Sequence, residues 1–215
     1  MSGITYDYMS KYLKGLIGES EGVIKELEDF AQEHNVPIVR EETARLIEFM
    51  VTTKKPKKIL ELGTAIGYSS ILMALTLNGD VQITTIERDE RMVEIASNNI
   101  KKAGLENNIT IMEGDCLSIL ENLNEEFDMI FIDAGHGHYC EFLPHCLRML
   151  SKDGVIMADN VLFRGMVACN ELMVKRKITI VKRMRKYLDM VSQDENLMTT
   201  VLPMGDGIAL TVRRN

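Results

Sequence analysis

Two short apolar runs each end in an acidic residue, and this is the pattern with the clearest chemical meaning. Asp133 follows residues 129–132, and Asp159 with Asn160 follows residues 155–158. Such runs predict buried parallel strands, whose carboxyl ends meet at the ligand-binding edge of an α/β sheet. Two carboxylates and an amide oxygen brought together there suit a hard divalent cation, and favour Mg²⁺. The alternative is that each acid only ends its strand in a turn or caps a helix.

A second candidate site begins with a glycine-containing segment upstream. Residues 61–67 run from the end of a predicted strand (59–62) towards a predicted helix (69–77). Their glycines permit a tight turn and close approach of a ligand. Glu87 ends the next predicted strand, where a carboxylate can bond both hydroxyls of a ribose. Asp115, after the third strand, could contact an adenine.

The type of cofactor follows from these acids. They suit a cationic ligand and disfavour a pyrophosphate, which would need basic residues or a bare helix N-terminus. The segment also lacks the complete GxGxxG fingerprint of dinucleotide-binding proteins. The pattern therefore favours S-adenosylmethionine over NAD.

The elements that position these residues alternate along the chain. Alternation of strands and helices predicts right-handed βαβ units and a mostly parallel sheet with helices on both faces. Two final strands joined by four residues predict an antiparallel hairpin. We expect one α/β domain over 1–215, doubly wound and Rossmann-like with a seven-stranded sheet, in which 1–55 form helices of a cap and 56–215 the core. The predicted elements are helices 20–34, 41–51 and 69–77 and strands 59–62, 81–86, 109–112, 129–132, 155–158, 198–203 and 208–213.

Length and composition fit one globular domain. The 215 residues can bury one sizeable core, and no apolar run approaches the roughly 18 residues that span a membrane. The start of the chain lacks the apolar region of a signal peptide, so we expect a cytoplasmic protein whose four cysteines are free thiols.

One stretch is strongly basic, although the chain as a whole carries a formal net charge of −7. Seven of the twelve residues from Lys175 to Lys186 are basic. Such a run is either a solvated helix face or a contact for phosphates.

With these residues in view, the chain resembles the cation-dependent class I O-methyltransferases, which include catechol and caffeoyl-CoA O-methyltransferases. Within that family it is most similar to bacterial tRNA 5-hydroxyuridine methyltransferases, on the VPI segment followed by a helix, the VLFRG loop, and the basic helix before an LPxGDG hairpin. The matching motifs are EHNVPIV (33–39), LELGTAIGYSS (60–70), TIER (85–88), EGDC (113–116), FDMIFIDAGHGHY (127–139), DGVIMADNVLFRG (153–165) and LPMGDGIALTVRR (202–214).

The resemblance implies roles for individual residues. Asp133, Asp159 and Asn160 would bind Mg²⁺, and Asp133 would also be catalytic. The chain would form a homodimer. The residues implied for S-adenosylmethionine are Val39, Glu61, Gly63, Ser69, Glu87, Asp115 and Asp133, and those for RNA are Arg164, Lys182, Arg183 and Arg185.

One position departs from the family pattern. His136 stands where the family commonly has a lysine, which is taken as the base that removes the acceptor proton. An ordinary histidine has a pKa of about 6.5, against about 10.4 for lysine, so His136 could act as the base near neutral pH. The alternatives are that His136 is a polar loop residue and the metal alone activates the oxygen, or, less favoured, that it joins Asp133 and His138 in a Zn²⁺ site.

The expected acceptor is 5-hydroxyuridine in the anticodon loop of tRNA, because its hydroxyl and adjacent carbonyl oxygen can chelate a metal as a catechol does. A small catechol-like phenol is the first alternative. An NAD-dependent dehydrogenase is a distant second. The N-terminal helices and residues 161–165 are candidates for a lid over the site.

Overall fold

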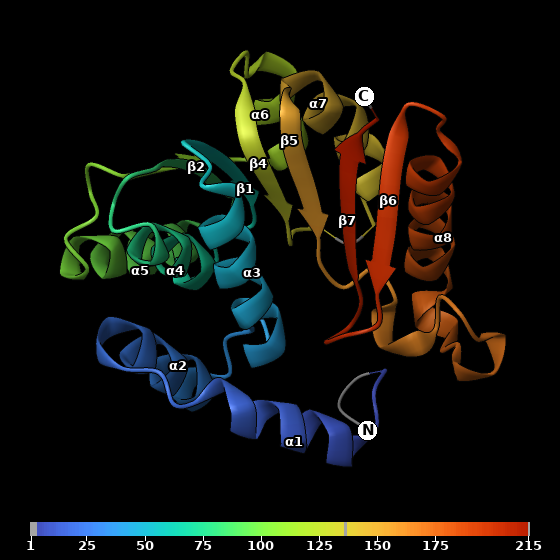
Figure 1. Ribbon diagram of the computed structural model, residues 1–215, viewed down its shortest axis with the longest axis horizontal. Helices are drawn as coiled ribbons and strands as arrows, with labels where there is room; N and C mark the ends of the chain where they lie inside the picture. The colour runs from blue at the N-terminus through green and yellow to red at the C-terminus, as the bar shows by residue number, and fades with distance from the viewer. Residues whose placement is uncertain (1–3, 136, 215) are drawn as a thin grey trace.

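The computed structural model describes residues 4–135 and 137–214. Seven strands in this part of the chain form one sheet in the order β3-β2-β1-β4-β5-β7-β6. The first five pair in parallel, and β7 runs antiparallel to both β5 and β6, as expected (Figure 1). The strands are β1 (Lys58–Leu62), β2 (Gln82–Glu87), β3 (Ile109–Glu113), β4 (Phe127–Ile132), β5 (Leu150–Ala158), β6 (Leu197–Leu202) and β7 (Ile208–Arg213).

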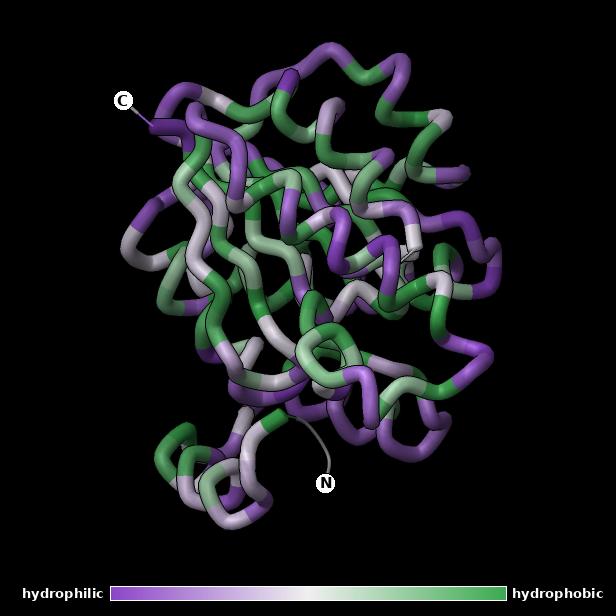
Figure 2. Tube along the Cα trace, turned by 90° about the vertical axis from the view of Figure 1, so that its right-hand side faces the viewer, coloured by the Kyte–Doolittle hydropathy of each residue, from purple (hydrophilic) through white to green (hydrophobic). Residues whose placement is uncertain are grey.

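Helices cover both faces of the sheet. Alternate strand residues face opposite sides, so one core packs against α2 to α5 and the other against α6 to α8. Figure 2 shows hydrophobic stretches gathered along the strands and hydrophilic ones mostly in the outer segments. The helices are α1 (Asp7–Ile17), α2 (Gly22–His34), α3 (Glu41–Lys54), α4 (Tyr68–Thr76), α5 (Glu90–Lys102), α6 (Cys116–Asn122), α7 (Tyr139–Met149) and α8 (Ile178–Gln193), with 3-10 turns at Phe163–Gly165, Asn170–Leu172 and Lys175–Lys177.

The fifth strand is longer than its sequence pattern suggested. We expected it over 155–158, whereas β5 begins at Leu150, which pairs with Phe127 across a register shift. Because residues 151–153 are only partly buried or exposed, they lack the continuous apolar run that signals a buried strand. The carboxyl end, which carries the site residues, is where we expected it.

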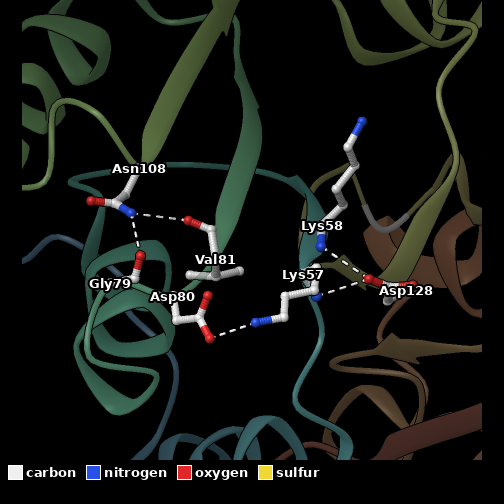
Figure 3. Close-up of polar contacts among 7 residues, drawn as sticks. All are labelled: Lys57, Lys58, Gly79, Asp80, Val81, Asn108 and Asp128. Atoms are coloured by element: carbon white, nitrogen blue, oxygen red, sulfur yellow. Dashed lines mark hydrogen bonds and ion pairs between the residues drawn. The ribbon is translucent and has the colours of Figure 1, made fainter.

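Side chains tie down the amino edge of the sheet (Figure 3). Asp128 accepts hydrogen bonds from the backbone amides of Lys57 (2.8 Å) and Lys58 (3.0 Å), joining the starts of β1 and β4. Asn108 Nδ2 donates to the carbonyl oxygens of Gly79 (2.6 Å) and Val81 (3.0 Å). These hydrogen bonds hold the strands together at their amino ends, and the loops at their carboxyl ends extend from the same sheet.

At that opposite edge the N-terminal helices approach the sheet. Figure 1 shows α1 and α2 lying below the edge at which β4 and β5 end. No helix in the described part of the chain is both long and apolar enough to cross a bilayer.

Candidate functional site

A cavity of about 930 Å³ opens at the carboxyl edge of the parallel strands. It lies where β1 and β4 are neighbours, the point at which strand order reverses and open α/β sheets bind ligands. The loops after all five parallel strands contribute to its wall, together with the segment before α3. From these loops come Gly63, Thr64, Ala65, Glu87, Arg88, Asp115, Cys116, Asp133, Ala134, Asp159 and Asn160.

Backbone hydrogen bonds past the strand ends hold the acidic residues in place. The amide of Asp133 donates to Leu62 O and that of Asp159 donates to Ile132 O, both at 2.9 Å. The hydroxyl of Tyr139 donates to the carbonyl oxygens of Ile132 (3.1 Å) and Asp159 (3.0 Å). The backbone pairing of the sheet therefore continues as far as each acid, which fixes its position.

The three predicted metal ligands come together as expected. Asn160 Nδ2 donates to Asp133 Oδ1 at 2.9 Å, and the Asn160 backbone amide donates to Asp159 Oδ1 at 2.6 Å. Asn160 has a φ of +60°, and this left-handed turn brings its side chain back toward β4.

Burial gives this cluster an unusual electrostatic state. Burial raises the pKa of Asp133 well above its usual range, and the charges of Asp159 and Glu61 add to the effect, while the hydrogen bond from Asn160 opposes it. Burial likewise raises the pKa of Asp159 to about 6, against the hydrogen bond from Asn160. The buried Asp159 and the partly buried Asp133 repel each other when both are charged, and a cation would relieve this repulsion. Their oxygen atoms are the ligands that Mg²⁺ prefers, so the residues fit that ion.

Of the residues predicted to contact the cofactor, Glu61 is the exception. Val39, Gly63, Ser69, Glu87, Asp115 and Asp133 line the cavity, whereas Glu61 does not. Its buried carboxylate accepts hydrogen bonds from the hydroxyls of Ser69 (2.5 Å), Ser70 and Thr85 (2.6 Å). Glu61 therefore lies behind the wall and positions Ser69 at the start of α4.

Two of the acidic residues that line the cavity also stabilise the local structure. Glu87 accepts from the amides of Ala65 (3.0 Å) and Arg88 (2.9 Å), which joins the ends of β1 and β2. Asp115 is the N-cap of α6 and accepts from the Ser118 amide at 3.2 Å. Asp115 therefore caps a helix and also lines the cavity.

The predicted base, His136, lies outside the described residues. His138 is the N-cap of α7, lines the cavity and pairs with Glu141. Within residues 4–135 and 137–214, no group of three or more His, Cys, Asp or Glu side chains is arranged to hold a metal. The Zn²⁺ alternative depends on His136.

The basic stretch divides into two parts. Arg183 Nη1 donates to Gly137 O at 2.9 Å, and Arg185 Nε donates to Val167 O at 2.8 Å, so both arginines fasten α8 to neighbouring loops. These two residues and Lys182 lie outside the cavity lining, whereas Arg164 is part of it, and a role of all four residues in RNA contact stays a prediction.

Arg176 and Lys177 line the cavity instead, together with Arg164, and sequence reasoning did not single them out. They lie on the 3-10 turn that precedes α8. The buried residues of α8 recur every three or four positions from Val181 to Val191, which turns the remaining cations of the helix away from the sheet. The basic composition was visible in the sequence, but the direction of each side chain depended on where the helix began.

The fold and the site together define a class of protein: an α/β enzyme with a ligand cavity and a neighbouring pair of carboxylates at the carboxyl edge of its sheet. The O-methyltransferase family profile matches residues 16–214, and the chain belongs to this family. This confirms the expected class of enzyme, an S-adenosylmethionine-dependent O-methyltransferase, and leaves the dehydrogenase alternative without support.

Individual relatives agree with that assignment. A catechol O-methyltransferase of Niastella koreensis is 30% identical over 223 residues and covers 99% of each chain. A caffeoyl-CoA O-methyltransferase of Stellaria longipes is 29% identical over 88% of this chain and 83% of the relative. A crystal structure from Staphylococcus aureus, provisionally assigned as a caffeoyl-CoA O-methyltransferase, superposes with a TM-score of 0.89 and 34% identity, covering 97% of this chain and 100% of that one.

Proposed function

We propose that this chain uses S-adenosylmethionine and Mg²⁺ to methylate 5-hydroxyuridine in the tRNA anticodon loop, giving 5-methoxyuridine. One observation carries the proposal: the cavity that holds Asp133, Asp159 and Asn160 is also lined by the cations Arg164, Arg176 and Lys177. An acidic floor suits a metal and a sulfonium cofactor, whereas a basic rim suits an acceptor that carries phosphates.

In this proposal the cofactor lies along the loops after β1 to β4. Asp115 contacts the adenine, Glu87 the ribose hydroxyls, and Gly63, Ser69 and Val39 the methionine end. Gly63 has a φ of +101°, which glycine adopts readily, and the absence of a side chain there leaves room for the backbone of Asp133 beside the methionine end. Asp133 lies between the methionine end and the acceptor.

The chemistry is transfer of a methyl group from sulfur to oxygen, with loss of one proton from the acceptor. Mg²⁺ held by Asp133, Asp159 and Asn160 would lower the pKa of the acceptor hydroxyl. The rigid strand ends hold the acceptor in line with the methyl group, which makes the displacement nearly unimolecular. His136 remains our proposed base, and the helices of residues 1–55, with the 161–165 loop, our proposed cap over the reaction.

The cofactor position can be tested through Cys116, a half-buried residue beside Asp115 in the cavity wall. Burial, with the charges of Asp115 and Glu87, raises the pKa of its thiol to about 11. Alkylation by iodoacetamide should therefore be slow at pH 7.5 and rise about tenfold per pH unit up to that pKa, because the thiolate is the nucleophile. S-adenosylhomocysteine should slow modification of Cys116 about tenfold or more, measured by peptide mass spectrometry.

Cys169, which lies outside the cavity lining, is the internal control and should react at the same rate with or without the ligand. Equal protection of both thiols would indicate a global effect, and no protection of Cys116 would contradict the proposed adenine position.

The acceptor can be tested with labelled S-adenosylmethionine and bulk tRNA that lacks 5-methoxyuridine, with Mg²⁺ or with EDTA. We expect Mg²⁺-dependent conversion of 5-hydroxyuridine. Replacing both Arg176 and Lys177 with Glu should weaken tRNA binding about tenfold or more and lower the salt slope by about two, since each phosphate contact adds roughly 0.7–0.9 to that slope.

The matched control is Lys152→Glu, which changes an exposed residue on β5 outside the cavity lining. An unchanged salt slope in the Arg176/Lys177 variant would show that these two residues do not contact phosphates, and the basic rim would then no longer support a tRNA acceptor. Transfer to catechol without transfer to tRNA would favour the small-phenol alternative, which the names of the Niastella and Stellaria relatives support.

A homodimer in the cytoplasm is part of the proposal. The helix α1 has no buried residue, and Tyr6, Tyr12 and Leu16 are each at least 65% exposed. Large apolar side chains exposed together are typical of surfaces that another chain covers.

A further inference from the structure

Two buried polar atoms in the cavity wall have no hydrogen-bond partner among the described residues: Thr43 Oγ1 and Asp206 Oδ1. Thr43 is 1% exposed. The other carboxylate oxygen of Asp206 pairs with Arg40 Nη2 at 3.3 Å, and the Asp206 side chain is only 13% exposed. All three residues line the cavity together with Asp159 and Asn160.

The fold brings these residues together from two distant segments. Arg40 is the N-cap of α3 and Thr43 lies in its first turn, while Asp206 lies in the turn between β6 and β7. A Cβ built on Gly205 would lie 3.0 Å from Thr43 Oγ1, so the hairpin turn packs directly on the start of α3. The carbonyl oxygen of Asp206 accepts from the amide of Leu162 at 2.9 Å, which fixes the turn to the loop after Asn160.

This cluster lies next to the acidic pair. The amide of Val161, which directly follows Asn160, donates to the carbonyl oxygen of Gly207 at 2.9 Å, so the turn that carries Asp206 lies against the loop that carries the acidic pair. An acceptor with its hydroxyl at Asp133 and Asp159 would therefore place the next part of its ring against Asp206 and Arg40.

A buried polar atom without a partner destabilises the folded state, and native proteins contain few of them. A ligand that supplies the missing partner removes this cost. The Asp206 carboxylate offers a hydrogen-bond acceptor beside the Arg40 guanidinium. A guanidinium has five N–H groups, and the ion pair with Asp206 leaves some of them for a ligand. The complementary ligand edge is an N–H group beside a carbonyl oxygen.

We propose that Arg40 and Asp206, supported by Thr43, form a subsite that recognises the imide edge of a pyrimidine acceptor; this rests on the proposed function. In 5-hydroxyuracil the hydroxyl is followed around the ring by a carbonyl, the N3–H group and a second carbonyl. With the hydroxyl and first carbonyl at the acidic pair, N3–H donates to Asp206 Oδ1 and the second carbonyl accepts from Arg40. A catechol offers only C–H groups at these positions.

The test compares three acceptors: an anticodon stem-loop carrying 5-hydroxyuridine, the same stem-loop carrying N3-methyl-5-hydroxyuridine, and catechol. The unaltered enzyme should prefer the N3–H stem-loop over the N3-methyl one by about 100-fold or more in kcat/KM, because a site built for a hydrogen bond rejects a ligand that lacks the donor. In Asp206→Asn the amide oxygen should face Arg40, which leaves the NH2 group opposite N3–H, so this ratio should fall below about tenfold. In Arg40→Gln the KM for the stem-loop should rise relative to that for catechol.

Binding of S-adenosylhomocysteine, measured by calorimetry, checks that each variant folds. Asp153→Asn, which alters an exposed acid on β5, is the control and should keep the discrimination of the unaltered enzyme. If Asp206→Asn does not fold, the Arg40→Gln comparison decides the proposal.

The outcomes separate this inference from the function on which it rests. Methylation of both stem-loops at equal rates would uphold the tRNA function and overturn the subsite. Persistent 100-fold discrimination in Asp206→Asn would show that the N3-methyl group is excluded by shape, and would also overturn it. Transfer to catechol alone would overturn the tRNA function and the pyrimidine subsite together.

Discussion

Asp159→Asn is expected to reduce methyl transfer about 1,000-fold, which corresponds to about 4 kcal/mol of transition-state stabilisation, while leaving cofactor binding within about threefold. Asp159 is a buried carboxylate next to the partly buried Asp133, and burial already raises the pKa of Asp159 to about 6. Removing its charge relieves the repulsion with Asp133, but it also replaces a charged carboxylate ligand with a neutral amide oxygen, which binds a divalent cation more weakly. The loss should therefore appear in turnover.

Three measurements check this expectation. Turnover is compared with Mg²⁺ and with EDTA, S-adenosylhomocysteine affinity is measured by calorimetry, and the melting temperature is measured with and without Mg²⁺. The metal should raise the melting temperature of the unaltered protein and not that of the variant, because a ligand stabilises only the state that binds it. Full activity of Asp159→Asn in EDTA would exclude a metal role for this residue, and Asp153→Asn is the matched control on β5, the strand that Asp159 follows.

Gly63→Ala is the substitution with the second largest expected effect, a reduction of about 100-fold in kcat/KM. A Cβ at this position would lie 2.9 Å from the carbonyl oxygen of Asp133 and 3.0 Å from the Cβ of Ala134. Because a backbone atom is in the way, relief requires the end of β4 to move. That movement displaces Asp133, which borders both the cofactor and the acceptor positions.

Gly67→Ala separates this clash from the cost of backbone conformation. Gly67 also has a positive φ, +82° against +101° at Gly63, but its Cβ would meet nothing closer than 3.5 Å. Both variants should lose about 1 kcal/mol of stability from the strained φ. Only Gly63→Ala should lose both cofactor affinity and turnover, and an equal loss in the two variants would show that conformational strain, rather than displacement of Asp133, is responsible.

The convergence of Asp133, Asp159 and Asn160 followed from the sequence because it depends on one rule. Each acid directly follows a short apolar run, such runs form buried parallel strands, and the carboxyl ends of parallel strands share an edge. The same rule placed Glu87 and Asp115 at the cavity. Glu61 shows the limit of motif reasoning, since only the packing of Ser69, Ser70 and Thr85 around its carboxylate removes it from the cavity surface.

The direction of the basic side chains could not be obtained in the same way. Residues 175–186 are basic as a group, but the 3-10 turn ending at Lys177 points Arg176 and Lys177 into the cavity. Arg183 and Arg185 are engaged by carbonyl oxygens of loops that lie far away in the sequence.

The sequence by itself therefore determined the order of strands and helices, the edge of the sheet that carries the site, and the class of chemistry, because these follow from local hydrophobic pattern and from the polarity of strands. Only the tertiary structure decided which polar groups line the cavity together and keep hydrogen-bonding capacity that contacts within the protein do not use. The pairing of Arg40 with Asp206 joins residues that are far apart in the chain. Such contacts depend on how the N-terminal helices and the final hairpin pack together, and a local pattern carries no information about that packing.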